Sequence, residues 1–369
     1  MKNGLEHRLP QYEPLWGEWY ADSFLGESSR GAMFRLKDRH GRRSALRVMT
    51  VDSNYSGRSL SSMTSAALER INSMLPLAGE AYLVSCRNFT VKNIGGGTPT
   101  AADILVQTDE VYPADIYGGE QLPYVQARKL ADNICRGIRN AHAKGFTFGD
   151  ICPDNICIDL ENHYCLDAPG SCNPLRPDQA YCAPETAGER YDKFRADIYS
   201  FGILLYELFS GGMLPLQYKG MSREEAIVRR QSGEAFGPPA GAPPELQRVI
   251  MKACMAHPES RYRSIDEMYR DLRALPVDHI PAAYEQDYRP RHMHKEQPVR
   301  EHTRQEHHTQ ERYHEQHHEH RSVNREHHEP VQEDEHESQS MKIYVMVLLY
   351  MLLAAGIGFL IFAIFRLAS

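Results

Sequence analysis

The sequence predicts an α+β domain, followed by a polar linker and one membrane-spanning helix. Residues 19–50 have the alternation and glycine-containing turns of three short strands, whereas residues 124–144 carry apolar side chains at helical spacing. The composition then changes: residues 286–340 are mostly Glu, Gln, Arg and His, and residues 343–365 contain no charged residue. With 369 residues, the chain has room for one large domain with appendages or for two ordinary domains.

The charge and the cysteines argue against two classes of function. The formal net charge is -7 and no basic face dominates, so we expect no nucleic-acid partner. The eight cysteines show no paired Cys-x-x-Cys spacing, so we interpret them as structural thiols in a reducing compartment rather than as a zinc or redox site. Because the N-terminus lacks the apolar run of a secretory signal, we expect the first domain to be cytoplasmic.

The first part of the chain is predicted to form a small sheet. The expected strands cover residues 19–24, 32–37, 44–50, 82–94 and 104–108, with a helix over residues 59–74. Gly26 and Gly31 lie in the turn between the first two strands. Such a turn can lay backbone N–H groups over phosphates, and it can equally be a hairpin turn that needs glycine for its geometry.

Three oxygen-bearing side chains follow the helix of residues 124–144. Asp150 and Asn155 lie close together in the sequence, and Asp167 follows twelve residues after Asn155. One carboxylate can accept a hydroxyl proton, while the amide and the second carboxylate can ligate Mg²⁺. This combination is typical of phosphoryl transfer, so these residues are our candidates for catalysis and metal binding.

The order of further motifs resembles the protein kinase family. The glycine-containing turn lies upstream of Asp150, and the segments Ala183-Pro184-Glu185 and Asp197-Ile198-Tyr199-Ser200-Phe201-Gly202 lie downstream. The resemblance covers about residues 20–275, and the segment of residues 257–264 looks most like bacterial Ser/Thr kinases.

This resemblance implies a two-lobed protein kinase-like fold. The kinase-like domain would span residues 13–277, with a small β-rich N-lobe over about residues 13–112 and a larger α-helical C-lobe over about residues 113–277. Residues 109–112 would form the hinge beside the adenine of ATP. Ser171 and Tyr181 are the hydroxyl residues of a short activation segment.

The resemblance also assigns roles to single residues. Asp150 would be the catalytic base, and Asn155 and Asp167 would bind Mg²⁺. ATP binding would involve Gly26, Ser28, Gly31, Arg47 and Glu69. In this set, Glu69 would pair with Arg47 and so position it. Asp197 would hold the backbone of the catalytic loop, and Glu185 would pair with Arg261.

Several of these positions depart from the family pattern. Ser28 replaces a glycine of the loop, and Arg47 replaces the Lys that pairs with the ATP phosphates. Gly149 and Cys152 replace an Arg and a Lys on either side of Asp150. The Asp-Phe-Gly motif reads Asp167-Ala168-Pro169.

Three functions follow from this pattern. The first is a membrane-anchored kinase that transfers the γ-phosphoryl group of ATP to protein Ser or Thr, at a rate weakened by the departures. The alternative is a pseudokinase, a nucleotide-binding or scaffolding module at the membrane with a signalling partner. The third is an adaptor whose histidine-rich linker senses a metal ion or pH.

The C-terminal part is predicted to hold the domain at a membrane. Residues 278–341 have too few apolar side chains to offset the entropy cost of ordering, so we expect a disordered His- and Glu-rich linker. Residues 342–366 are long enough to span the hydrocarbon core of a bilayer as a helix. We therefore expect a single-pass protein with a C-terminal anchor and a cytoplasmic kinase-like domain.

Overall fold

The structure is a computed structural model, and it describes residues 4–95, 98–116, 122–149, 151–172, 178–218 and 220–275. These residues all lie in the first of the two units into which the chain divides, Met1–Thr303 and Arg304–Ser369. The predicted base Asp150, the predicted linker and the predicted membrane helix lie outside the described residues.

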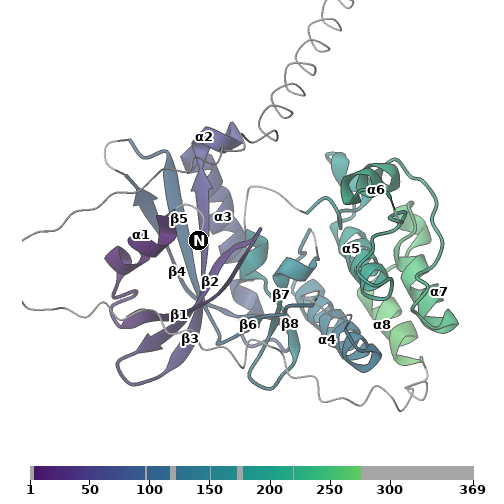
Figure 1. Cartoon of the computed structure of the whole chain (residues 1–369), viewed down its shortest axis with the longest axis horizontal. Coiled ribbons are helices and arrows are strands. Elements are labelled where there is room, and N and C mark those ends of the chain that lie inside the picture. The colour runs from purple at the N-terminus through teal and green to yellow at the C-terminus, as the bar shows by residue number, and fades with distance from the viewer. Residues whose placement is uncertain are drawn as a thin grey trace, which may run out of the picture. The chain divides into compact units, whose positions relative to one another are not determined.

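The predicted N-terminal sheet is confirmed, and Figure 1 shows its five strands. The order across the sheet is β1-β2-β3-β5-β4, and all neighbours are antiparallel. The bounds are β1 Trp19–Ser28, β2 Gly31–Asp38, β3 Arg43–Asp52, β4 Cys86–Ile94 and β5 Ala101–Thr108, with a short helix α2 at Ser53–Ser56. The strands β1 and β2 are longer than expected because pairing continues to the tip of their hairpin.

The two faces of the sheet pack against different helices. Leu46 and Val48 of β3 join an apolar cluster with Leu5 and Leu9 of helix α1, Leu5–Tyr12. Met49 points to the other face and belongs to the large core that includes helix α3, Leu60–Met74. This division follows from the strand geometry, in which successive side chains point to opposite faces.

Helix α1 precedes residue 13, the expected start of the domain, and the sequence analysis does not predict it. A buried carboxylate of β5, Asp103, holds the helix on the sheet. It accepts hydrogen bonds from Arg8 Nε at 2.7 Å, Tyr12 Oη at 2.9 Å and Thr50 Oγ1 at 2.6 Å. Burial and the hydrogen bond to Asp103 raise the pKa of Tyr12 to about 12.

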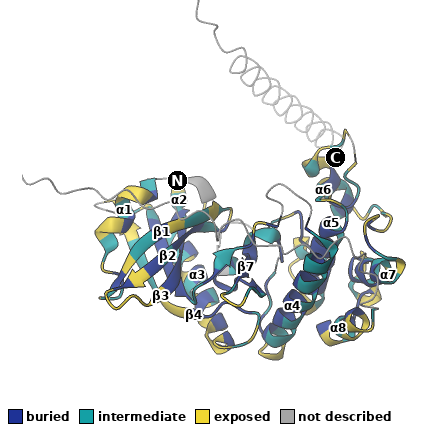
Figure 2. Cartoon of the chain, turned by 60° about the horizontal axis from the view of Figure 1, so that its bottom comes forward, coloured by how far each residue is buried: buried dark blue, intermediate teal, exposed yellow. Residues whose placement is uncertain are grey.

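The chain after the sheet forms the helical lobe. Its helices are α4 Tyr124–Ala143, α5 Lys193–Leu208, α6 Arg223–Gln231, α7 Pro244–Ala253 and α8 Ile265–Arg273, and its small sheet consists of β6 Tyr112–Pro113, β7 Ile156–Ile158 and β8 Tyr164–Leu166. Figure 2 shows that α5 is buried along most of its length. A Cβ at Gly202 would lie 2.8 Å from the Cβ of Ala253 at the end of α7. Helix α5 can therefore pack this close to α7 only because residue 202 is glycine.

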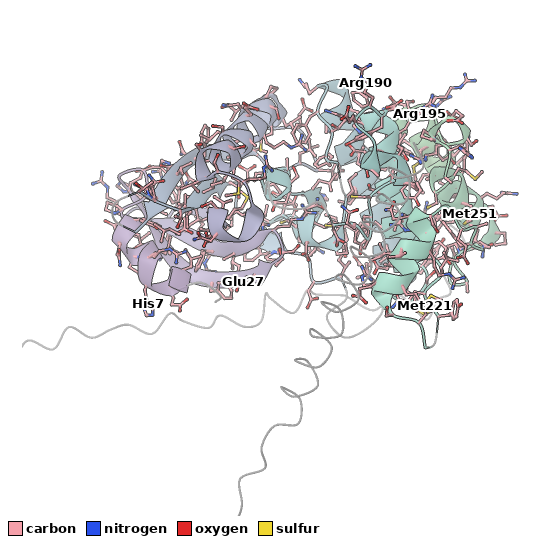
Figure 3. The ribbon with its side chains drawn as sticks, turned by 90° about the horizontal axis from the view of Figure 1, so that it is seen from above. His7, Glu27, Arg190, Arg195, Met221 and Met251 are labelled. Carbon is pink, nitrogen blue, oxygen red and sulfur yellow. The ribbon has the colours of Figure 1, made fainter. Side chains whose placement is uncertain are left out.

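The two-lobed α+β architecture is therefore confirmed for the described residues. In the view of Figure 3, His7 and Glu27 lie on the sheet lobe, whereas Arg195 and Met251 lie on the helical lobe. None of the described helices has both the length and the apolar character needed to cross a bilayer.

The interpretation of the cysteines as structural thiols agrees with their positions. Seven cysteines with described side chains are buried and free of disulfides. Burial raises the pKa of the Cys86 thiol to about 11 and that of Cys254 to about 12. Thiols of this kind are poor nucleophiles and poor metal ligands at neutral pH.

We predict that Arg8→Ala lowers the free energy of unfolding by about 2 kcal/mol, because the carboxylate of Asp103 stays buried after losing a charged donor. Urea denaturation of the full-length chain measures this loss. Gln11→Ala on the exposed side of the same helix is the control and should change stability by less than about 0.5 kcal/mol. Equal effects of the two changes would contradict the anchoring role of Asp103.

Candidate active site

The backbone before Asp150 is fixed by a buried carboxylate of α5. Asp197 accepts hydrogen bonds from the N–H of Phe148 and the N–H of Gly149, both at 2.8 Å. Nε2 of His142, near the end of α4, lies 3.0 Å from the same carboxylate. Asp197 therefore holds the start of the predicted catalytic loop, residues 148–155, as the resemblance to protein kinases implied. Asp150 itself lies outside the described residues.

Asn155 and Asp167 are brought together, as predicted. Asn155 ends a short 3₁₀ helix, Pro153–Asn155, and its side chain is fully buried. Its Oδ1 accepts a hydrogen bond from the N–H of Cys152 at 3.1 Å, and its carbonyl oxygen accepts one from the N–H of Asp167 at 2.8 Å. The amide oxygen that was expected to bind Mg²⁺ thus closes the turn of the loop.

Arg47 of β3 forms an ion pair with Asp167 of the segment after β8. Both groups are buried, with 3% of Arg47 and 1% of Asp167 exposed. The other carboxylate oxygen of Asp167, Oδ1, accepts a hydrogen bond from the N–H of Gly170 at 3.0 Å. A Cβ at position 170 would lie 2.7 Å from Asp167 Oδ2, so a glycine is needed beside the pair. The ion pair joins the two lobes.

The predicted pairing of Glu69 with Arg47 is wrong. Both residues are described, no ion pair joins them, and Glu69 is exposed on α3. The buried positions of α3 include Ala67 and Ile71, so residue 69 lies on the opposite side of the helix. The helical period alone could have shown this.

Arg70, rather than Glu69, connects α3 with the catalytic loop. Its Nη2 donates hydrogen bonds to the carbonyl oxygens of Thr147 and Phe148 and to Ser171 Oγ, the last two at 3.1 and 3.3 Å. Its guanidinium also lies 4.1 Å from the ring centre of Phe146. The sequence analysis did not select Arg70, although it shares the inward face of α3.

The predicted glycine-containing turn is a tight hairpin. Ser28 pairs with Gly31 at the end of the ladder, so only Ser29 and Arg30 form the turn. Gly31 has a φ of 115°, and a Cβ there would lie 2.3 Å from the carbonyl oxygen of Val48. The glycine at position 31 is therefore required by the close approach of β3, which is the simpler of the two interpretations offered above. Gly26 lies at an irregularity of β1, with a φ of 154°.

The tip of this hairpin contacts the catalytic loop. Asp154 Oδ2 accepts hydrogen bonds from the N–H of Ser29 at 3.1 Å and from its Oγ at 2.5 Å. Arg30 Nη2 lies 3.3 Å from the Sγ of Cys152, and only 2% of Arg30 is exposed. The sequence analysis missed this contact because it joins residues that are 122 positions apart.

Apolar side chains from both lobes pack together next to the predicted hinge. Met33 of β2 and Ala45 of β3 are buried in one cluster with Val111 of the hinge and Cys157 of β7. Their burial means that the lobes are closed on each other at this point.

The described residues do not fit a Mg²⁺ ion in this arrangement. Asp167 bonds with Arg47 and Gly170, and the Oδ1 of Asn155 bonds with the N–H of Cys152. Mg²⁺ requires near-octahedral coordination by oxygen atoms, and it would have to displace Arg47 from its carboxylate.

The segments downstream of the cleft agree with the expected architecture. Glu185 accepts two hydrogen bonds from Arg261, at 2.6 and 2.8 Å. Tyr181 is buried, and its hydroxyl contacts Glu207 and Arg223. Tyr181 is thus part of the packing of the helical lobe in this conformation and not an exposed acceptor of phosphate.

Comparison with known proteins agrees with this geometry. Residues 92–272 match the family model of protein tyrosine and serine/threonine kinases. The matched residues are 181 of the 369 in the chain. The match begins within β4, and it leaves out the elements that carry Ser28, Arg47 and Glu69.

The curated proteins to which this chain is similar include both Ser/Thr and Tyr kinases. A probable serine/threonine-protein kinase of Clostridium perfringens is 28% identical over 171 residues, which are 42% of this chain and 24% of that protein. Serine/threonine-protein kinase PknB of Mycobacterium leprae is 29% identical over 182 residues, 44% of this chain and 28% of that protein. Protein-tyrosine kinase 6 of Mus musculus is 24% identical over 151 residues, 38% of this chain and 33% of that protein. The chain thus spans about a quarter to a third of these relatives.

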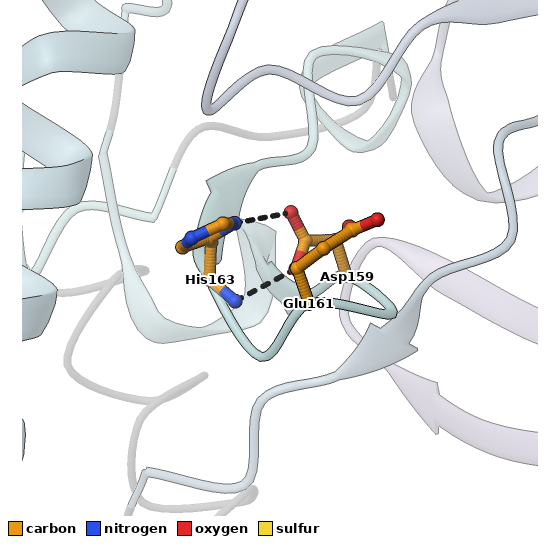
Figure 4. A group of neighbouring side chains, drawn as sticks. All are labelled: Asp159, Glu161 and His163. Atoms are coloured by element: carbon orange, nitrogen blue, oxygen red, sulfur yellow. Dashed lines mark hydrogen bonds and ion pairs between the residues drawn. The ribbon is translucent and has the colours of Figure 1, made fainter.

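A second group of polar side chains lies in the hairpin between β7 and β8, and Figure 4 shows it. Nδ1 of His163 lies 3.1 Å from Asp159 Oδ2, and the N–H of His163 donates to Asp159 Oδ1 at 2.7 Å. Glu161 is exposed beside them. These bonds close the hairpin turn, so we interpret the group as structural.

A cavity of about 650 Å³ opens beside this hairpin. Its lining includes Tyr82, Arg87, Asp109 and Asp159. Asp109, Glu110 and Val111 of the predicted hinge also line the cavity, whereas Arg47 and Asp167 do not.

We predict that Arg70→Ala lowers the free energy of unfolding by about 1–3 kcal/mol, because the carbonyl groups of the catalytic loop lose a charged donor. Denaturation of the full-length chain measures the loss. The neighbouring change Glu69→Ala is the matched control and should stay within about 0.5 kcal/mol of the unchanged protein. A larger loss for Glu69→Ala than for Arg70→Ala would reverse the assignment.

Proposed function

We propose that this protein is a kinase-family binding module, a pseudokinase, that binds a nucleotide and a protein partner at a membrane. Transfer of the γ-phosphoryl group to protein Ser or Thr is at most a slow activity in this proposal. The observation that carries it is the buried ion pair between Arg47 and Asp167.

Because of the ion pair, Arg47 and a Mg²⁺ ion would compete for the carboxylate of Asp167. Phosphoryl transfer in this family uses Mg²⁺ at the position of Asp167. Arg47 would have to release Asp167 to admit the metal, and Glu69 is not placed to accept Arg47 instead. Removing one partner from a buried ion pair costs about 3–5 kcal/mol, so this exchange is unfavourable unless the ligand supplies a new counter-ion.

Slow phosphoryl transfer is the second candidate, and the intact supports of the catalytic loop favour it. Asp197 accepts hydrogen bonds from the N–H groups of Phe148 and Gly149, just before Asp150, and the pair of Glu185 and Arg261 is formed. Catalysis by this fold depends mostly on positioning and on charge stabilisation. A loop that is already positioned retains part of that capacity. The similarity to Ser/Thr kinases of bacteria supports Ser or Thr as the acceptor.

The position at a membrane is supported by the sequence of residues 342–366. The uncharged run within it is long enough for one crossing. In the proposed topology, the kinase domain lies in the cytoplasm, and residues 278–341 are a flexible spacer between the domain and the C-terminal anchor.

The test compares ATP binding with phosphoryl transfer in the full-length chain, purified in a mild detergent. Binding of ATP is measured by calorimetry, and transfer by incorporation of ³²P into the chain and into a generic basic protein. The proposal predicts binding, with incorporation that is absent or only slightly above that of Asp150→Asn. Rapid incorporation that is abolished by Asp150→Asn would instead identify an efficient kinase. Absence of ATP binding would overturn the nucleotide-binding part of the proposal.

A further inference from the structure

The cavity beside the β7–β8 hairpin carries more acidic than basic side chains. Its volume is about 650 Å³, and its lining includes six carboxylates and three guanidinium groups. Each of these guanidinium groups lies 4.0 Å or less from a carboxylate of the same lining. The three carboxylates that are left belong to Glu80, Asp159 and Glu161. The lining therefore keeps an excess of negative charge after its own ion pairs are formed.

These three carboxylates can accept a further cation. Lys144 Nζ lies 3.1 Å from Glu80, but the side chain of Lys144 is 45% exposed. His163 Nδ1 lies 3.1 Å from Asp159 in the hairpin of Figure 4. Glu161 is exposed in the same hairpin, and it forms no ion pair with any other residue that the structure describes. Because ion pairs at the surface are weak, a cationic ligand can replace Lys144 or add to Glu161.

The walls of the cavity come from both lobes. Trp19 of β1 and Gln107 of β5 belong to the sheet lobe, Asp109 belongs to the predicted hinge, and Leu160 belongs to the β7–β8 hairpin. Leu160 is 59% exposed and offers an apolar contact at the rim. The volume lies within the range of ligand-binding pockets, about 300–1,000 Å³. The lining thus suits a ligand that is cationic, partly apolar and able to contact both lobes.

The last described helix lies on the same side of α4 as the cavity. Arg136 of α4 donates a hydrogen bond at 2.7 Å to Oη of Tyr82, a residue of the lining. One turn further along α4, Arg139 bonds with Asp266 of α8 at 2.6 Å and lies 4.3 Å from the ring centre of Tyr269. Residues at this spacing share one side of a helix. The chain therefore leaves α8 close to the cavity.

The sequence after α8 contains a basic segment, residues 289–300. This segment has four basic residues and one acidic residue, whereas residues 301–340 have four basic and eleven acidic residues. Pro290 and Pro298 favour an extended backbone within it. The segment begins fourteen residues after Leu275, and a chain of this length can reach roughly 45 Å when it is extended. Positive charge is thus concentrated in the part of the sequence that can reach the cavity.

We propose that residues 289–300 dock into this cavity, with their basic side chains against the carboxylates of Glu80, Asp159 and Glu161. Covalent attachment raises the effective concentration of the segment to about the millimolar range, so weak contacts are sufficient to hold it. Because the cavity is lined by the predicted hinge and by both lobes, the docked segment joins the lobes. The proposal does not depend on nucleotide binding, and residues 301–341 remain as the spacer to the anchor.

Limited proteolysis by trypsin tests the docking on the full-length chain in a mild detergent. Cleavage after Arg291 lies within the segment, and cleavage after Arg312 lies outside it. In the unchanged protein, cleavage after Arg291 should be at least about fivefold slower than cleavage after Arg312, because the docked segment is mostly in its bound form. Raising the salt concentration to about 1 M should reduce this protection, since it screens the charges.

Variants of the cavity and of the segment should remove the protection. Glu161→Lys should speed cleavage after Arg291 about three- to tenfold and leave cleavage after Arg312 unchanged, because it turns an attraction into a repulsion. The combined change of Arg289→Gln and Lys295→Gln should act in the same direction, and it leaves the described domain untouched. Glu224→Lys, on the exposed side of α6 and outside the lining, is the matched control and should change neither rate. Thermal unfolding checks that each variant is folded.

Three results would overturn the proposal. Equal rates of cleavage after Arg291 and Arg312 in the unchanged protein would show that the segment is not docked. Protection that survives both Glu161→Lys and the two changes in the segment would show that another contact covers it. Protection that disappears on tenfold dilution would place the segment on a second copy of the chain and not in its own cavity.

Discussion

A buried ion pair links Arg47 of the sheet lobe to Asp167 of the helical lobe, and the function that we propose depends on it. It joins two elements that are far apart in the sequence, and it occupies the carboxylate on which the metal chemistry of the family depends. Gly170 fits beside it only because it has no side chain. The strength of the pair comes from its burial, since a pair exposed to water would contribute little.

Two other arginines extend the same pattern. Arg70 of α3 bonds with the backbone of the catalytic loop, and Arg30 of the hairpin tip lies against Cys152 of that loop. Each of these three arginines reaches from the sheet lobe to the helical lobe. The apolar cluster that contains Met33, Ala45 and Cys157 also joins the two lobes. Guanidinium groups therefore join the lobes at the places where the family pattern implies a metal ion, a Lys and a helix Glu.

The local features of the fold could be predicted from the sequence, because strand alternation and helical spacing are local patterns. The hold of Asp197 on the catalytic loop and the pair of Glu185 with Arg261 were also correctly expected from the order of motifs. The predicted pairing of Glu69 with Arg47 was wrong because it was based on the motif of the family and not on the helical period of α3. Arg30 and helix α1 were missed because their burial depends on contacts across long sequence separations, which no local pattern contains. The roles of Asp150, the linker and the membrane helix remain predictions.

The most direct test of the central claim is a double-mutant cycle on the free energy of unfolding of the full-length chain, with Arg47→Met, Asp167→Asn and both changes together. If the pair holds the lobes, each single change leaves a buried polar group without its partner, and the coupling energy should be about 2 kcal/mol or more. A parallel cycle of Arg47→Met with the exposed Glu69→Gln should show additive effects. Additivity within about 0.5 kcal/mol for Arg47 and Asp167 would contradict the claim.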